Sequence, residues 1–162
     1  MDHFLLRLTL TLCLLLLPLS ISAQTITGVA SVTDGDSLEI RGTRIRLHGI
    51  DAPKSRQLCT RPSGQHWRCG QQAALALSDR IGRRSVSCVT RDIDRYGRTI
   101  SVSLQDGVDL NSWMVNTGWA VAYRQFSRDY VAAETEARRA GHNIWSGSFV
   151  MPWEWRRGVR TP

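Results

Sequence analysis

The chain has 162 residues and a formal net charge of +7, and arginine supplies almost all of the positive charge because Lys54 is the only lysine. A basic balance favours polyanionic partners, namely nucleic acid, acidic polysaccharide or an anionic lipid surface, although it would equally keep a secreted protein soluble. The sequence contains no internal repeat and no low-complexity segment, which argues against a repeat array.

Residues 1–23 have the features of a secretory signal peptide. Arg7 precedes an apolar run from Leu8 to Leu17, a helix-breaking Pro18 and small residues follow, and cleavage is expected after Ala23. A membrane anchor is the alternative, but the apolar run is shorter than the ~20 residues that span a bilayer. The sequence therefore predicts export to a periplasm or out of the cell, without a stable membrane anchor. Roughly 140 residues remain, which suits one domain with a sizeable core.

Short strands joined by tight turns are expected at the start of the mature chain. The first three strands are predicted at Ile26 to Val32, Ser37 to Ile40 and Thr43 to Gly49. In the third strand the side chains alternate, so that Ile45 and Leu47 lie on one face while Arg44, Arg46 and His48 lie on the other.

One acidic turn precedes the second predicted strand, and another follows the third. Asp34-Gly35-Asp36 predicts a tight turn, in which Gly35 is free to take backbone angles closed to other residues and has a carboxylate on each side. Asp51-Ala52-Pro53 ends the third strand, because proline supplies no amide hydrogen. If the intervening strands are antiparallel, Asp36 and Asp51 lie close together. Two carboxylates and a backbone carbonyl would suit a hard cation such as calcium, and Arg46 could bind a phosphate there.

Three cysteines, Cys59, Cys69 and Cys88, remain after the signal peptide is removed. In an exported protein, Cys59 and Cys69 are expected to form a disulfide worth roughly 3 kcal/mol on the chain-entropy model. A metal site is the alternative, although no local C-x-x-C or paired histidine supports one. Cys88 is then either a buried apolar thiol or a free thiol able to link two molecules.

The rest of the chain predicts a hairpin and three helices. The hairpin strands are expected at Val86 to Thr90 and Thr99 to Leu104, and the helices at Gln71 to Ile81, Leu110 to Thr117 and Ser127 to Ala140. Ser127 is predicted to be an N-cap, and Glu134 with Arg138 an i,i+4 ion pair. Five short strands with about three helices predict an α+β fold built on a small, partly open barrel.

The domain is expected to span residues 24–147, followed by a basic tail at residues 148–162. Trp153 and Trp155 in this tail could stack on bases or sugars, but they more simply cover the open edge of a small core. A monomer is expected.

Three motifs in order carry a resemblance to a known family. They are Asp34-Gly35-Asp36, the stretch R-L-H-G-I-D-A-P at residues 46–53, and D-R-Y-G-R at residues 94–98. Together they resemble the staphylococcal nuclease (thermonuclease) family, from about Thr25 to about Trp145. The resemblance implies an OB-fold barrel whose outer surface and loops bind nucleic acid. Exported members often have a second cysteine pair, and Ser103 stands near the expected partner of Cys88.

The resemblance also implies a calcium-dependent endonuclease that hydrolyses phosphodiester bonds of DNA and RNA. Asp36 and Asp51 would be calcium ligands, with the carbonyl of Ala52 as a third. Arg46 and Arg98 would bind the phosphate and balance the charge that grows as phosphorus becomes five-coordinate. Tyr96 would contact a base or a sugar.

The sequence departs from the family at Lys54, where the family usually has glutamate to activate or position the attacking water. Lysine has an ordinary pKa near ~10.4 and is protonated at neutral pH, so it does not accept a proton. Its charge would also oppose calcium. The metal alone, Glu39 or Asp94 could activate water instead. Because general-base help is worth ~10² to 10⁴ in rate, we expect a weak nuclease or a silent binder of nucleic acid or acidic exopolysaccharide.

Overall fold

One strongly curled sheet forms the barrel in the computed structural model, which describes residues 24–161. The expected signal peptide lies outside these residues. The strands of this sheet are β1 (Thr25–Val29), β2 (Ser31–Asp34), β3 (Ser37–Ile40), β4 (Thr43–Leu47), β8 (Ser85–Ile93), β9 (Thr99–Gln105) and β10 (Val108–Asp109). Their order is β1-β8-β9-β4-β3-β2, and β10 pairs with β9. Neighbours are antiparallel except β4 and β9, which are parallel.

The sheet curls because its two edge strands are consecutive in the chain. Only Ala30 separates β1 from β2, yet these strands lie at opposite ends of the strand order. Taken together, β1 and β2 are one bent strand, and with β3, β4, β8 and β9 they make the five-stranded partly open barrel that the sequence predicts. The α+β, OB-like fold is therefore confirmed.

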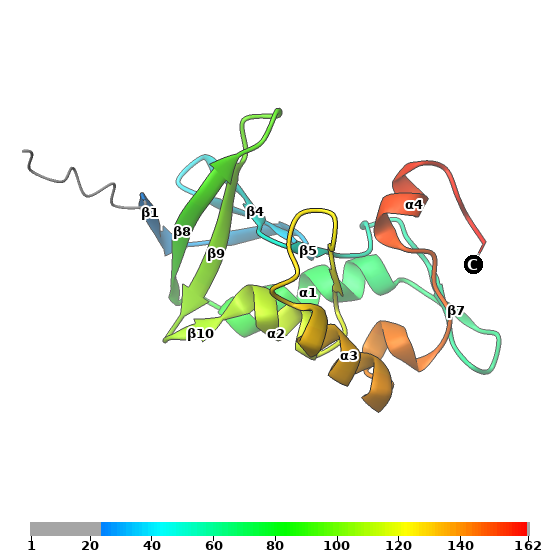
Figure 1. The fold of residues 1–162 in the computed structure, drawn as a ribbon. Helices are drawn as coiled ribbons and strands as arrows, with labels where there is room; N and C mark the ends of the chain where they lie inside the picture. The colour runs from blue at the N-terminus through cyan, green and yellow to red at the C-terminus, as the bar shows by residue number, and fades with distance from the viewer. Residues whose placement is uncertain (1–23, 162) are drawn as a thin grey trace, which may run out of the picture.

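Four α-helices accompany the barrel within residues 24–161. They are α1 (Cys69–Ile81), α2 (Leu110–Asn116), α3 (Val131–Ala140) and the short α4 (Pro152–Arg156), with a 3-10 turn η1 (Asn143–Ser146) before α4. Two-residue pairs join β5 (Ile50–Asp51) to β11 (Val121–Ala122) and β6 (Cys59–Thr60) to β7 (His66–Trp67). In Figure 1, α1, α2 and α3 lie below β4 and β5, and α4 lies to the right of the barrel. Over the described residues, none of the helices has the length and apolar character needed to cross a bilayer.

The main core lies between the barrel, α1 and α2. Ile45 and Leu47 of β4 are at most 1% exposed, whereas the alternate residues of this strand remain accessible. This alternation confirms the predicted faces of the strand. Helix α1 adds Leu77 and Ile81 to the same core, and α2 adds Met114.

A smaller second core contains a disulfide between Cys59 and Cys69, as the sequence predicts. Cys88 is a free and buried cysteine on β8, opposite Ser103 of β9. The Ser103 hydroxyl lies 3.2 Å from the Cys88 sulfur. Burial raises the pKa of the Cys88 thiol, which keeps it protonated and unreactive. Of the two predicted states of this residue, the structure confirms the buried one.

Loss of the disulfide should destabilise the protein. The bond joins residues separated by 10 positions, so reduction should lower the free energy of unfolding by about 3 kcal/mol on the chain-entropy model. Urea unfolding of oxidised and reduced protein measures the difference, and a Cys59→Ser, Cys69→Ser double variant should match the reduced protein. Equal midpoints for the oxidised and reduced forms would contradict this prediction.

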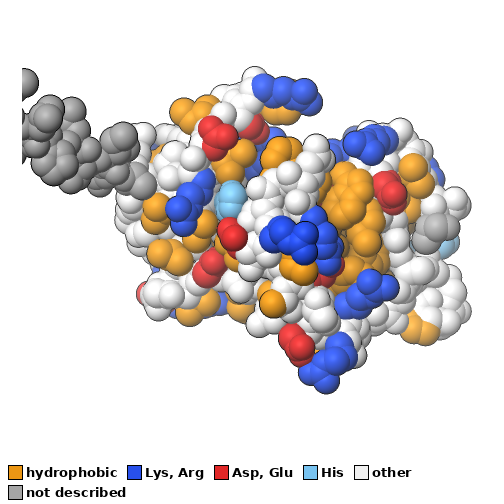
Figure 2. Space-filling model, viewed as in Figure 1, with side chains coloured by type: hydrophobic (Ala, Val, Ile, Leu, Met, Phe, Trp, Pro, Cys, Tyr) orange, Lys and Arg blue, Asp and Glu red, His pale blue; other side chains and the backbone are white. Residues whose placement is uncertain are grey.

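The chain after residue 147 packs against the second core. Trp153 of α4 contacts this core, and its ring stacks on Tyr123 at a centroid distance of 5.3 Å with an interplanar angle of 4°. Figure 2 shows hydrophobic side chains gathered beside α4. The interpretation of Trp153 as a cover for the core is confirmed, whereas Trp155 lies under the guanidinium of Arg160.

Two predictions about the last long helix are wrong. Helix α3 begins at Val131, with Tyr130 at its N-cap, and the Ser127 hydroxyl instead accepts a hydrogen bond from the amide of Asp129. Glu134 makes no ion pair with Arg138, because it is buried and pairs with Arg124 at 2.8 Å. Its other oxygen accepts a hydrogen bond from the amide of Ala122 at 2.6 Å. A buried carboxylate thus fixes α3 to β11.

Candidate phosphodiester site

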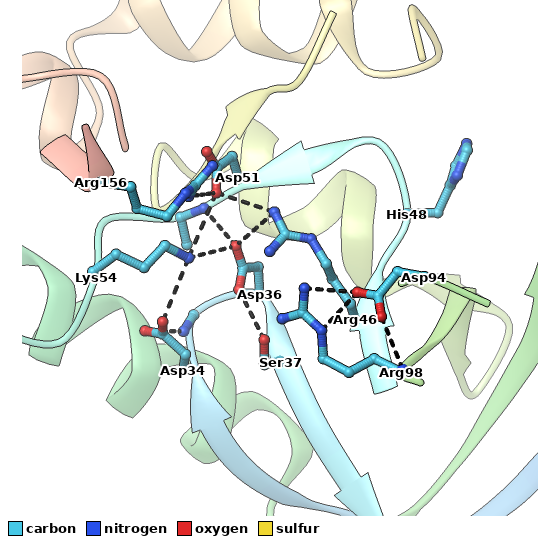
Figure 3. A network of polar contacts seen from close by, with 12 residues as sticks. Asp34, Asp36, Ser37, Arg46, His48, Asp51, Lys54, Asp94, Arg98 and Arg156 are labelled. Atoms are coloured by element: carbon cyan, nitrogen blue, oxygen red, sulfur yellow. Dashed lines mark hydrogen bonds and ion pairs between the residues drawn. The ribbon is translucent and has the colours of Figure 1, made fainter. Parts of the chain in front are cut away.

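The antiparallel pairing of β3 and β4 brings the two predicted aspartates together. Ser37 of β3 lies opposite Arg46 of β4, and the amide of Leu47 donates to the carbonyl of Asp36 at 2.9 Å. Asp51 lies on β5, which follows β4 after one turn, and its carboxylate points back toward Asp36 (Figure 3). Both aspartates are fully buried. The sequence prediction that these carboxylates meet at one end of the strands agrees with this geometry.

The glycine between the first two aspartates provides space for this approach. A Cβ atom on Gly35 would lie 2.8 Å from the Cβ of Ala52 and 3.0 Å from the Cβ of Ala73. The backbone of Gly35 does not have a positive φ, so this turn does not use the left-handed conformation that is open to glycine. Glycine is needed because the two acidic turns and α1 pack against one another without room for a side chain.

Arg46 reaches the two buried aspartates from β4. Its Nη2 atom lies 3.2 Å from Oδ1 of Asp51 and 3.6 Å from Oδ2 of Asp36. Within residues 24–161, only Nη2 of this guanidinium has a hydrogen-bond or ion-pair partner, and the side chain is 14% exposed. Its other donors therefore remain for a ligand.

Lys54 lies inside the acidic cluster. Its Nζ is 2.9 Å from Oδ2 of Asp36, 3.4 Å from Oδ2 of Asp34 and 3.5 Å from Oδ1 of Asp51. Burial acts to lower the pKa of Lys54, but attraction to Asp36, Asp34 and Asp51 outweighs it and raises this pKa. The lysine is thus a permanent cation at neutral pH, as predicted, and it cannot act as a base.

The pKa values of the aspartates follow from the same contacts. Burial would raise the pKa of Asp36, but Lys54 and Arg46 together hold it well below its usual range. At Asp34 burial prevails over the attraction of Lys54, so that pKa is raised. Asp34 was not predicted as a site residue, although it belongs to the same Asp-Gly-Asp turn as Asp36.

A third cation comes from the end of the chain. Nη1 of Arg156 on α4 donates to Oδ1 of Asp51 at 2.7 Å, and the side chain is 34% exposed. Arg156 was not predicted as a site residue, because no local pattern links it to an aspartate 105 positions earlier. Figure 3 shows Arg156, Lys54 and Arg46 approaching the aspartates from three sides.

Arg98 precedes β9, which pairs with β4, but it does not contact the buried aspartates. Its Nη2 lies 2.7 Å from Oδ2 of Asp94, and its Nε donates to the same oxygen. Burial would raise the pKa of Asp94, but hydrogen bonds from Arg98 and Tyr96 and the charge of Arg98 together lower it. The Tyr96 ring is 58% exposed, and the Arg98 guanidinium lies 5.5 Å from its centroid. These residues form an exposed surface beside the strand that holds Arg46.

The residues present do not fit the calcium ion that the family resemblance implies. Calcium needs six to eight oxygens at about 2.3–2.6 Å, and in the described part of the chain no group of three His, Cys, Asp or Glu side chains is arranged to hold a metal. The Lys54 ammonium lies between Asp36 and Asp51, where the ion would bind. A divalent ion about 4 Å from an ammonium would be repelled by roughly 8 kcal/mol at an effective dielectric of ~20.

Two further observations agree with this result. Ala52 approaches Asp36 through its amide, which donates to Oδ2 at 3.1 Å, rather than through the predicted carbonyl. Asp51 Oδ2 is buried and has no partner among the described residues, but it lies on the side of the carboxylate away from Lys54 (Figure 3). It therefore does not add an oxygen to a site shared with Asp36.

Comparison with known proteins identifies the family. Residues 44–147 match the family model described as staphylococcal nuclease homologue. The chain is 37% identical over 127 residues to the succinoglycan biosynthesis protein ExoI of Rhizobium meliloti. The aligned residues cover 76% of this chain and 66%, just under two thirds, of that protein. It is 33% identical over 150 residues to a micrococcal nuclease of Shigella flexneri, covering 82% of this chain and 80% of the relative.

An uncharacterized endonuclease of Escherichia coli is 34% identical over 136 residues, covering 79% of this chain and 82% of the relative. The matched segment contains all of β4 except its first residue, together with the second acidic turn and the hairpin that carries Arg98. The barrel and these matches together show that the chain belongs to the staphylococcal nuclease family.

Proposed function

We propose that the protein is an exported monomeric nuclease of this family, which binds the backbone of single-stranded DNA or RNA and hydrolyses it slowly. The observation that carries the proposal is Arg46, whose guanidinium is fixed beside Asp36 and Asp51 while part of it remains open to solvent. A fixed guanidinium matches the oxygens of a phosphoryl group and can bind them through two hydrogen bonds.

The surface beside Arg46 extends this binding site. Arg98 is oriented by Asp94 and would supply a second guanidinium to the phosphate. The exposed ring of Tyr96 would contact a base or a sugar of the same strand. Both arginines would stabilise the negative charge that develops on the phosphoryl oxygens during hydrolysis.

Hydrolysis is expected to be slow because a general base is missing. Lys54 is protonated, and the Asp94 carboxylate is already bound by Arg98. Glu39 is exposed on β3 opposite Arg44, two positions along the ladder from the pair that holds Arg46. Loss of general-base help alone should lower the rate by ~10² to 10⁴ relative to a nuclease with a complete site, and without a metal ion at the phosphate the rate should be lower still. Calcium-dependent hydrolysis, which the resemblance implies, is not part of this proposal because the site does not fit the ion.

A cleavage and binding assay tests the proposal. Mature protein, residues 24–162, should bind a fluorescent single-stranded oligonucleotide, and its affinity should fall steeply as salt increases because phosphate contacts release counterions. At high enzyme concentration the oligonucleotide should be cut slowly, above the rate of a buffer blank. Absence of both binding and cleavage would refute the proposal.

A second candidate function is a silent binder of polyanions that has lost hydrolysis. Lys54 favours this second function, because an ammonium stands where a glutamate would activate or position the attacking water. One relative is named a succinoglycan biosynthesis protein, which makes an acidic exopolysaccharide a candidate ligand. Salt-sensitive binding of an acidic polysaccharide, without binding of a neutral one and without cleavage of DNA or RNA, would select this function.

A further inference from the structure

We infer that the Lys54 ammonium is a built-in cation that takes the place of a divalent ion, so that the phosphate site works without calcium. This inference rests on the proposed function and specifies how the site of that function is kept electrically balanced. Its first support is position. Nζ contacts oxygens of three different aspartates, all within 3.5 Å, at the point where the two acidic turns meet.

The backbone fixes Lys54 at this point. Its carbonyl accepts a hydrogen bond from the amide of Gln57 at 2.7 Å, and its amide donates to the side chain of Gln57 at 3.2 Å. Gln57 is fully buried, and its side chain donates in turn to the carbonyl of Val150 at 2.6 Å.

Helix α1 packs against the backbone of Lys54. A Cβ on Gly70 would lie 1.8 Å from the Lys54 carbonyl oxygen, so this glycine allows the first turn of the helix to lie directly against the lysine backbone. Lys54 is therefore held from two sides, and its side chain is only 16% exposed. A surface lysine that samples many rotamers would have neither these backbone contacts nor a side chain this well buried.

Charge balance is the second support. Three carboxylates, those of Asp34, Asp36 and Asp51, face three cations, which are Lys54, Arg46 and Arg156. The cluster is neutral as it stands and has no surplus negative charge to attract a divalent ion. A phosphate approaching Arg46 then meets neutralised aspartates instead of two exposed negative charges. Lys54 thus neutralises the aspartates, as a bound divalent ion would otherwise do.

The single lysine allows a direct experiment. With lysine labelled with 15N at Nζ, the protein should give one ammonium signal, because the chain contains only Lys54. Calcium should leave this signal unchanged and shift the melting temperature by less than about 1 °C. Binding of a short oligothymidylate should be equally tight in calcium and in chelator.

Two variants without the ammonium should respond to calcium, in contrast to the wild type. Lys54→Glu creates a surplus of carboxylates, so calcium at about 100 times its Kd should raise the melting temperature by about 5–10 °C. Oligothymidylate binding should then require calcium. Lys54→Gln removes the ammonium without adding an oxygen anion, and it should show a smaller shift in the same direction. The control Lys54→Glu with Asp51→Asn should lose most of the response.

The outcomes separate the inference from the proposed function. A calcium shift in the wild type as large as in Lys54→Glu, with loss or movement of the Nζ signal, would overturn the inference because calcium would then displace the ammonium. If no form binds oligothymidylate, the proposed function fails, and the calcium shifts still decide the inference. Should Lys54→Glu not fold in chelator, its refolding yield with and without calcium replaces the melting temperature, and equal yields would refute the inference.

Discussion

Arg46→Ala should lower the rate of oligonucleotide cleavage by about 10² to 10³, the usual cost of losing one fixed donor to a developing phosphoryl charge. The guanidinium is positioned by Asp51 and Asp36, so no flexible neighbour can replace it at the same place. Single-turnover measurements at high enzyme concentration give the rate, and anisotropy with the same oligonucleotide gives the affinity.

A matched control separates position from net charge. Arg83 is an exposed arginine in the turn after α1, and Arg83→Ala removes the same charge far from the site. This control should retain nearly all of the cleavage rate. The assignment of Arg46 fails if both variants lose activity equally, because a diffuse effect of the basic surface would then explain the result.

Lys54→Met should have the largest effect on stability, with the free energy of unfolding falling by about 3–5 kcal/mol. The substitution leaves Asp34, Asp36 and Asp51 with two guanidiniums and without the ammonium that contacts all three. Urea unfolding followed by tryptophan fluorescence measures the loss. Adding Asp36→Asn removes the main unpaired charge, so the double variant should be less destabilised than the sum of the single variants. Strict additivity would show that Lys54 and Asp36 do not interact.

The pH dependence of wild-type stability has a definite sign. The pKa of Asp36 is lowered in the folded state, so its contribution is present above its unfolded pKa of about 4 and is lost as the pH falls through the folded value. The pKa of Lys54 is raised, so its contribution is present below about pH 10.4 and is lost as the pH rises through the folded value. Asp34, with a raised pKa, partly opposes Asp36 at low pH.

The parts of the fold that depend on residues close together in the sequence could be predicted. Strand β3 has the predicted bounds, Ser37–Ile40, because apolar alternation and the tight turns on both sides are local signals. The meeting of Asp36 and Asp51 also followed from local pattern, since one antiparallel pairing is enough to bring them together. The predicted disulfide needed only the spacing of Cys59 and Cys69 and the expectation of export.

The parts that depend on tertiary contacts were not predictable in this way. Glu134 has the sequence spacing of a surface ion pair, but packing of α3 against β11 buries it. The charge of Lys54 was predicted to oppose calcium, yet only the structure shows this ammonium between the aspartates. Arg98 carries the family motif, and its pairing with Asp94 instead of the buried aspartates depends on the shape of the hairpin tip.

The contact between Asp51 and Arg156 ties the end of the chain to the acidic cluster. Arg156 lies 105 positions after Asp51, so the barrel strands can pair before α4 docks, and the cluster then lacks one counter-charge. Its charge balance is completed only when α4 packs in place. A partly folded chain therefore carries a surplus of negative charge at this point that the finished protein no longer has.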